Sequence, residues 1–408
     1  MKKDADVVIV GGGLNGPALA LALAQAGLRT AIVDAAPRKT YQDPAFDGRA
    51  YALSFATVQV LKALQLWPSI SAQAQPILDI KVSTGEAGRG SAPFVVHFDH
   101  RELDTGPMGH LVEDRYLRSA LLSAIEASAD IELLSGETVT DQRGHPGGIE
   151  VSLASGRSLF GSLLIGADGR ASGTARRAGI ARTEWAYDQA SLVCAIAHER
   201  PHDGIAHQMF FPEGPLAILP LPGNRSSIVW TESADRAAAI TAMDDQDYLT
   251  ELRPRFGSFL GEIELAGDRY TYPLGLSLAQ SLTGRRTALV GDAAHGIHPL
   301  AGQGLNLGLR DVAALADVAA DAIRRGADIG AADVLDRYAR WRRFDIAALA
   351  VATDGINRIF SNRNPILAAA RTLGLGMVEG MPSIRRGMMR EAAGLTGDLP
   401  RLLRGLPL

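Results

Sequence analysis

The stretch VVIVGGGLNG, residues 7–16, decides the fold of this chain. Its four β-branched residues predict a short buried strand, and the glycines that follow fit the pattern G-x-G-x-x-G. That pattern is informative only between a strand and a helix, and an uncharged apolar run predicts a helix over residues 15–26. Residues 30–34 are then expected to form the next strand. The sequence therefore predicts a strand–helix–strand unit of an α/β fold.

The glycines of this stretch have separate roles in a dinucleotide-binding turn. Gly11 permits the tight turn, Gly13 lets the backbone approach a pyrophosphate, and Gly16 lets the helix pack closely on the strand. Asp34 ends the second strand 21 residues after Gly13, where an acid accepts hydrogen bonds from ribose hydroxyls. The arrangement predicts dinucleotide binding and leaves the choice between FAD and NAD open.

Composition and charge narrow the class of protein further. The chain has 408 residues, of which 47% are hydrophobic and 21% charged, close to ordinary globular usage, so a disordered chain is excluded. The formal net charge of −4 gives no indication of a nucleic-acid partner. The single cysteine, Cys194, excludes an internal disulfide and a cysteine-cluster zinc site. We expect Cys194 to be a core residue and we expect no metal.

Residues 7–28 carry no formal charge and match the length of a membrane span. Three glycines and Pro17 interrupt this stretch early, so a strand, turn and helix explain it better than a membrane span does. The chain opens with Met1-Lys2-Lys3-Asp4 and enters the strand at once, which leaves no room for a signal peptide. We therefore expect a cytoplasmic protein without an integral membrane segment.

Two later buried-strand patterns also end in glycine–aspartate turns. Residues 162–165 lead into Gly166-Ala167-Asp168-Gly169, and residues 287–290 lead into Gly291-Asp292. Open α/β sheets bind ligands at the carboxyl ends of strands, although an aspartate there more often caps a helix. A glycine-rich loop, residues 298–306, opens a further long helix, whose N-terminus suits a second anionic part of the cofactor, such as a reduced flavin.

Strand patterns between these segments predict an inserted, mostly antiparallel domain. We expect a discontinuous nucleotide-binding domain over residues 1–75, 100–184 and 274–355, a substrate domain over residues 76–99 and 185–273, and a C-terminal helical segment over residues 356–408.

Three motifs of the chain resemble the class A flavoprotein aromatic hydroxylases, which have the p-hydroxybenzoate hydroxylase fold. They are GGGLNG (11–16), GADGRAS (166–172) and GDAAHGIHPLAGQGLNLGLRD (291–311). Residues 47–54, 214–220 and 361–363 are similar to the ubiquinone-biosynthesis hydroxylases within that group. The resemblance covers essentially the whole chain and implies an FAD-binding Rossmann-like domain.

The resemblance also implies roles for individual residues. The first glycines and Asp34 would hold the ADP half of FAD, Arg49 and Asp168 would lie near phosphates, and Asp292 would bind the ribitol. The backbone of residues 302–306 would face the flavin pyrimidine, with Pro299 on the oxygen-reacting side. The residues assigned to the cofactor in this way are Gly11, Gly13, Gly16, Asp34, Arg49, Asp168, Gly169, Gly291, Asp292, Pro299, Gly302, Gln303, Gly304, Leu305 and Asn306.

The implied activity is that of an FAD-dependent monooxygenase of ubiquinone biosynthesis. In this family the reduced flavin forms a C4a-hydroperoxide with O2 and hydroxylates the ring of a polyprenylated phenol. The electron donor stays open between NAD(P)H and a protein. No catalytic residue is assigned, and we expect His295 and His298 to pack or form hydrogen bonds rather than transfer protons.

Other readings stay open, because binding motifs report FAD and not turnover. The same fold could serve a prenyl-chain reductase, a different aromatic monooxygenase, or a non-catalytic FAD-holding scaffold of a membrane biosynthetic complex. Residues 356–408 carry a net charge of +5 with scattered Leu, Ile and Met. This pattern suits a peripheral contact with the inner face of the membrane or with a biosynthetic complex, and it also suits helices packed on the FAD-binding domain.

Overall fold

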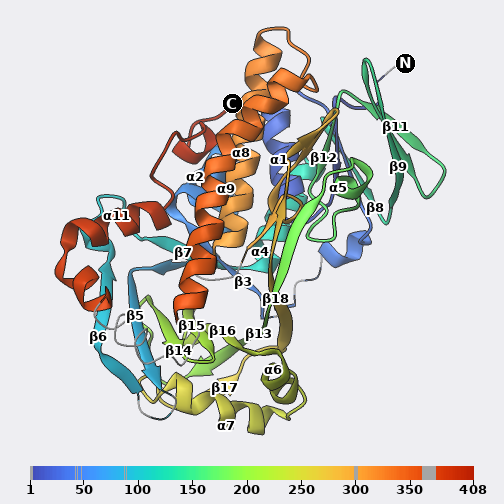
Figure 1. Cartoon of the computed structure of the whole chain (residues 1–408). Helices are drawn as coiled ribbons and strands as arrows, with labels where there is room; N and C mark the ends of the chain where they lie inside the picture. The colour runs from blue at the N-terminus through green and yellow to red at the C-terminus, as the bar shows by residue number, and fades with distance from the viewer. Residues whose placement is uncertain are drawn as a thin grey trace.

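The computed structural model describes the chain except residues 1–2, 42, 44, 47, 87, 89, 298–301 and 361–373. Long helices and a parallel sheet form the upper part of the molecule in Figure 1, and a large mostly antiparallel sheet forms the lower part. The fold is the mixed α/β architecture that the sequence predicts.

The upper sheet has six strands in the order β19-β20-β12-β1-β2-β8, and β20, β12, β1, β2 and β8 are parallel to one another. Its strands are β1 (Val7–Val10), β2 (Thr30–Asp34), β8 (Ile131–Ser135), β12 (Leu163–Gly166), β19 (Thr283–Gly284) and β20 (Thr287–Leu289). Strand β1 lies in the middle and pairs Val7 with both Thr30 and Leu163. The strand–helix–strand unit expected from the glycine stretch is therefore at the centre of the sheet.

Both faces of this sheet are covered, because side chains along a strand alternate between the faces. Val7 and Ile9 pack among the helices, whereas Val8 and Val10 pack against a three-stranded antiparallel sheet. The small sheet contains β9 (Val139–His145), β10 (Gly148–Leu153) and β11 (Ser158–Gly161). The helical layer contains α1 (Asn15–Gln25), α2 (Phe55–Ala63), α4 (Asp114–Glu126), α8 (Gln303–Arg324) and α9 (Ala332–Phe360).

The lower sheet has nine strands, eight of them in the order β21-β18-β13-β16-β15-β14-β5-β6, with β17 paired to β13. Its strands are β5 (Asp79–Glu86), β6 (Gly90–Asp99), β13 (Arg182–His198), β14 (Ile205–Phe211), β15 (Gly214–Leu221), β16 (Arg225–Ser233), β17 (Ile263–Leu265), β18 (Tyr270–Ala279) and β21 (His295–Gly296). Helices α6 (Ala234–Thr241) and α7 (Asp245–Phe256) pack on one face of it through a separate core. Cys194 belongs to that core and is fully buried, as expected.

A third small sheet joins the two large ones. It contains β3 (Ala50–Ser54), β4 (Gln75–Ile77) and β7 (Gly109–Glu113), in the order β3-β7-β4. Leu111 of β7 packs in one cluster with Ala195 and Leu221 of the nine-stranded sheet. The expected hairpin over residues 76–99 is present as β5 and β6, and it forms one edge of that sheet.

The boundary expected at residue 356 falls inside α9, which continues to Phe360. Beyond it, α11 (Pro382–Ala392) packs beside β6, and the last residues return to the helical layer, where Leu402 and Leu403 are buried. Ala393 accepts a backbone hydrogen bond from Ala56 at 3.0 Å. The described residues contain no helix that combines the length and the hydrophobicity needed to cross a bilayer.

Candidate functional site

Three strand-end turns meet at the carboxyl edge of the parallel sheet. The Gly11 amide donates to the carbonyl of Val33, and the Ala167 amide donates to the carbonyl of Val10, each at 2.8 Å. The Val290 amide in turn donates to the carbonyl of Gly166 at 2.9 Å. The three glycine-containing motifs of the sequence are therefore neighbours in space, at the edge where open α/β sheets bind ligands.

The first glycine turn is tight against the protein on one side and open on the other. Gly11 has a φ of +113°, and a Cβ placed there would lie 2.3 Å from the carbonyl oxygen of Ala167. A Cβ on Gly16 would lie 2.0 Å from the carbonyl oxygen of Gly11. A Cβ on Gly13 would meet no atom within 4 Å. Gly11 and Gly16 thus serve the packing of the turn, whereas Gly13 leaves space for a ligand.

Asp34 lies beside this turn and holds it. Its carboxylate accepts hydrogen bonds from the amides of Gly12 and Ala36, the latter at 2.6 Å. The carboxylate is therefore fixed at the end of β2, in the place where a ribose-binding acid is expected.

Asp168 supports the N-terminus of the short helix that follows it, α5 (Gly173–Arg177), whose N-cap residue is Ser172. Its carboxylate accepts hydrogen bonds from the Ser172 hydroxyl at 2.5 Å and from the amide and hydroxyl of Thr174, both at 2.9 Å. Gly169 has a φ of +77° and open space beyond its Cα. The carboxylate therefore has the capping role that is common at such turns, and its role at a phosphate stays a prediction.

Asp292 occupies the third turn, and its side chain is 44% exposed. Arg170 from the second turn approaches its carboxylate at 3.4 Å. Arg182, at the start of β13, donates to the backbone carbonyl of Asp292 at 3.2 Å and to that of Ala293. The backbone of the turn is thus held from the nine-stranded sheet, and the carboxylate is left largely open to a ligand.

A buried ionic network supports the same turn from behind. Asp311 of α8 accepts hydrogen bonds from the Gly291 amide at 2.9 Å, from Arg342 at 2.8 Å and from His295 at 2.5 Å. Burial alone would raise the pKa of Asp311, but His295 and Arg342 outweigh burial and hold the pKa below its usual range. His295 thus forms a hydrogen bond, as expected, and Asp311 is a site residue that the sequence analysis missed.

The N-terminus of α8 lies next to β3. Gly302 has a left-handed conformation with a φ of +63° and precedes the first helical residue, Gln303. Asn306 uses its side-chain oxygen to accept from the Ser54 amide at 2.9 Å and from the Thr57 hydroxyl at 2.7 Å. The side chain of Asn306 therefore anchors the helix, which leaves the backbone of the first turn to face a ligand.

Two of the remaining residues of this loop, Gly304 and Leu305, lie in the first turn of α8, and a Cβ on Gly304 would meet no atom within 4 Å. Pro299 and the neighbouring His298 lie outside the described residues. The expectations for those two positions therefore stay predictions.

Four arginines lie around two buried carboxylates, Glu113 and Asp114, and the sequence analysis assigned only one of them, Arg49. Asp114 is buried between Arg49, at 3.5 Å, and Arg118. Arg118 also lines a narrow cavity together with Gly12 and Gly13. The guanidinium group of Arg118 therefore lies beside the turn, where it suits a phosphate.

Glu113, the residue before Asp114, is a second buried carboxylate that binds two arginines. Glu113 is fully buried and accepts from Arg115 and Arg225, each at 2.8 Å. Both guanidinium groups also lie over the ring of Phe46, at 5.5 and 5.3 Å. The acid pair that precedes two arginines at residues 113–118 was the sequence signal for this cluster, but nothing in it indicated Arg225, which comes from β16.

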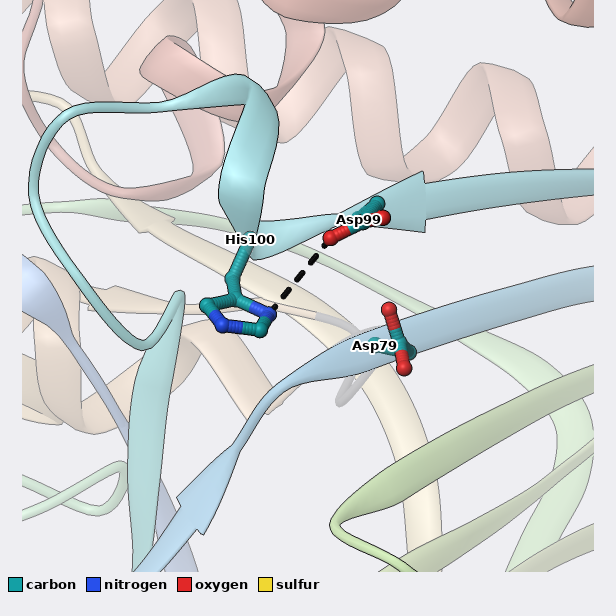
Figure 2. A group of neighbouring side chains, drawn as sticks. All are labelled: Asp79, Asp99 and His100. Carbon is teal, nitrogen blue, oxygen red and sulfur yellow. Dashed lines mark ion pairs between the residues drawn. The ribbon is translucent and has the colours of Figure 1, made fainter.

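A separate group of Asp79, Asp99 and His100 lies on β5, on β6 and just after β6 (Figure 2). Asp99 is already paired, because Arg101 donates to both of its carboxylate oxygens at 2.9 Å and lowers its pKa. The Nδ1 atom of His100 donates to the Leu78 carbonyl at 3.0 Å and lies 3.6 Å from the Asp99 carboxylate. These partners already satisfy the ligating atoms, so this group is a poor metal site.

Comparison with known proteins agrees with the geometry of the turns. Residues 4–353 match the protein family described as FAD binding domain. The chain is 42% identical to ubiquinone hydroxylase UbiL of Rhodospirillum rubrum over 100% of this chain and 94% of that protein. It is 35% identical to 3-demethoxyubiquinol 3-hydroxylase of Escherichia coli, and the match covers 96% of this chain and 98% of that protein.

Among solved structures, the fold is similar to that of p-nitrophenol 4-monooxygenase PnpA from Pseudomonas putida. The TM-score is 0.80 at 20% identity, and the match covers 97% of this chain and 99% of that chain.

Proposed function

This chain belongs to the FAD-binding family that includes the ubiquinone hydroxylases, and we propose that it hydroxylates the aromatic ring of a polyprenylated phenol in ubiquinone biosynthesis. It is an FAD-dependent monooxygenase. The observation that carries the proposal is the 42% identity to UbiL over the whole chain, together with three glycine turns at one sheet edge.

The residues at this edge fit FAD. Gly13, Gly169 and Gly304 each have open space where a side chain would stand, and each lies in a different strand-end or helix-start segment. Arg118, which binds the buried carboxylate of Asp114, also lines the narrow cavity beside Gly12 and Gly13, and a guanidinium group at that place suits a phosphate. When bound, FAD supplies the two-electron chemistry that activates O2.

The chain's own residues hold FAD in position and shield it from water. We assign the ADP half to the Gly11–Gly16 turn and Asp34, the phosphates to Arg49 and Arg118, and the ribitol to the open carboxylate of Asp292. The N-terminus of α8 stabilises negative charge through its free amides. No described side chain is assigned a proton-transfer role.

The substrate is expected between the third turn and the nine-stranded sheet. Strand β21 follows the Asp292 turn directly and pairs with β18, so the turn is continuous with that sheet. The end of α9 covers the same sheet, where the rings of Phe360 and Phe210 lie 4.2 Å apart. This arrangement supports the division into an FAD-binding domain and a substrate domain that the sequence suggests.

The test combines an assay in vitro with cells that lack the protein. The purified enzyme with FAD and a reductant should consume O2 and add one oxygen atom to a prenylated phenol, measured by mass spectrometry. Cells without the protein should accumulate a quinone precursor that lacks one ring hydroxyl. Asp292→Ala should purify largely without FAD and fail in both assays. A protein that keeps FAD and never consumes O2 with any such phenol would be a scaffold, and the proposal would be wrong.

We also propose that the described C-terminal helices contact an anionic membrane surface. Ile384 and Met388 lie one turn apart on α11 and form an exposed apolar stripe, and Met377 and Met381, which precede this helix, are exposed as well. On the opposite side, Met389 is buried. Exposed Arg386 and Arg390 flank this apolar stripe, which suits anionic headgroups.

Helix α9 also exposes large apolar side chains. Its side chains Phe344 and Val351 are 78% and 74% exposed. Flotation with vesicles containing anionic lipid should recover the protein in a salt-sensitive manner, and Ile384→Glu with Met388→Glu should abolish recovery. Equal recovery with neutral vesicles, or no recovery at low salt, would contradict the electrostatic contact.

A further inference from the structure

A cavity of about 420 Å³ lies on the nine-stranded sheet, beside the end of α7. Its lining includes Lys81, His207, Met209, Phe211, Arg255 and Phe259. The volume is within the range of small-ligand sites. None of these residues belongs to the flavin site described above.

The sheet separates this cavity from the proposed flavin site. Along β14, His207 and Met209 line the cavity, whereas Phe210 points to the other face and contacts Phe360 of α9. A molecule in the cavity is therefore on the opposite side of the sheet from α9. The cavity is therefore separate from the substrate region proposed above, which lies on the side of α9.

The cavity contains one partly buried cation without a partner among the described residues. Lys81 of β5 is partly buried, and no described residue accepts a hydrogen bond from its ammonium group or forms an ion pair with it. Its neighbour in the strand register, His207, is neutral at neutral pH, because burial and the nearby Lys81 lower its pKa to about 4. Arg255 is already paired with the buried Glu232 at 2.8 Å. Asp203, the only carboxylate among the described lining residues, is exposed.

The rest of the wall is apolar. Met209, Phe211 and Phe256 are buried, and the ring of Phe259 lies 4.6 Å from the ring of His207. A ligand that complements this wall has an apolar body, and a ligand that complements Lys81 has one negative charge.

We propose that this cavity binds a small organic anion, with a carboxylate or sulfonate against Lys81 and an aromatic or branched apolar body against Met209, Phe211 and Phe259. This site is separate from the hydroxylation proposed above and does not depend on it.

The test compares two fluorescent probes of nearly the same shape on the FAD-loaded enzyme. 1-Anilinonaphthalene-8-sulfonate carries the anionic group, and N-phenyl-1-naphthylamine has the same rings without it. Lys81→Met should weaken binding of the sulfonate about tenfold, as for the loss of one charge-assisted contact, and should leave the neutral probe unchanged. Lys81→Arg should retain sulfonate binding. Lys62→Met, an exposed lysine of α2, is the matched control and should change neither probe.

A second variant tests the apolar wall. Phe259 is 38% exposed, so Phe259→Ala should fold normally by circular dichroism and should weaken both probes, because each loses a ring contact. Either of two results would overturn the proposal. In the first, Lys81→Met weakens both probes equally or weakens neither of them. In the second, Phe259→Ala binds both probes as tightly as the wild type does. All readouts are binding constants without turnover, so their failure would not affect the proposed hydroxylase activity.

Discussion

At the scale of single residues, neighbouring glycines of the first turn differ in what surrounds them. A side chain at Gly16 would collide with the backbone of Gly11 at 2.0 Å, whereas one at Gly13 would enter open space. The first collision involves backbone on both sides and cannot relax cheaply. The second position is free in the protein alone and becomes crowded only if a cofactor approaches there.

This difference predicts two distinct phenotypes. Gly16→Val should lower the stability of the fold by about 2–4 kcal/mol and yield largely colourless protein. Gly13→Ala should have the same free energy of unfolding as the wild type when both lack FAD. It should bind FAD at least about tenfold more weakly. Urea denaturation of the apoproteins and FAD titration separate the two effects. Normal FAD affinity in Gly13→Ala would show that the cofactor does not approach this glycine.

His207 makes the stability of the protein depend on pH in a specific window. Its pKa is lowered from 6.5 to about 4, mainly by burial. Between these values the unfolded chain binds a proton that the folded chain does not, so stability falls as pH falls from 6.5 to 4. His207→Gln should remove this loss. Between pH 7 and pH 4.5, the free energy of unfolding of the variant should fall by about 2 kcal/mol less than that of the wild type. Parallel stability–pH curves for the two proteins would contradict the assignment.

Residues placed by a motif with a known spacing could be predicted, and residues held by contacts without such a spacing could not. Asp34 follows from the spacing of the glycine motif, and the Asp168 contact with the following helix was weighed as an alternative because capping is a short-range effect. Asp311 is different, because no spacing rule joins it to His295 and Arg342, which lie 16 and 31 residues away. Arg225 reaches Glu113 across 112 residues, and no local pattern indicates such a contact.

At the scale of elements, α8 begins in the glycine loop and offers the free amides of its first turn. Its N-terminus carries a partial positive charge that would favour the anionic reduced flavin over the neutral oxidised form. Gln303, the first helical residue, is the position at which a new charge would act on that field.

Gln303→Glu should therefore lower the midpoint potential of the bound flavin. The added carboxylate would disfavour the reduced anion by about 1–2 kcal/mol, which is about 20–40 mV for a two-electron couple. Spectroelectrochemical titration measures this shift, with FAD content checked first. Gln246→Glu, an exposed residue in the first turn of α7 on the far side of the nine-stranded sheet, is the control and should leave the potential unchanged. An unchanged or raised potential in Gln303→Glu would mean that α8 does not face the flavin.

Elements with strong periodicity were predicted closely, and the others needed tertiary contacts. Strand β2 and helix α1 match the expectation to within one residue. Strand β13 runs over 17 residues, but the sequence predicts a strand only over residues 192–197, because the first half of β13 is mostly exposed and lacks an apolar pattern. Helix α6 was missed, since its eight residues are too few for a helical pattern to stand out.

At the scale of the whole molecule, the buried residue Glu113 connects the small joining sheet to the nine-stranded sheet. It ends β7, which belongs to the small joining sheet, and it binds Arg115 from the following helix and Arg225 from β16. Removing one partner of a buried ion pair leaves the other charge uncompensated, which costs more than the loss of an exposed pair.

Glu113→Gln should therefore weaken the connection between the sheets, because a neutral amide cannot balance two guanidinium groups. Both arginines are about 30% exposed and can be partly hydrated, so we expect a loss of about 2–3 kcal/mol rather than the full cost of a buried charge. Glu262→Gln, which removes the 70% exposed partner of Arg253, is the matched control and should cost less than about 1 kcal/mol. Guanidinium denaturation followed by flavin release and by tryptophan fluorescence should show one transition in the control and separated transitions in Glu113→Gln. Coincident transitions with an unchanged midpoint in Glu113→Gln would show that this ion pair does not couple the two sheets.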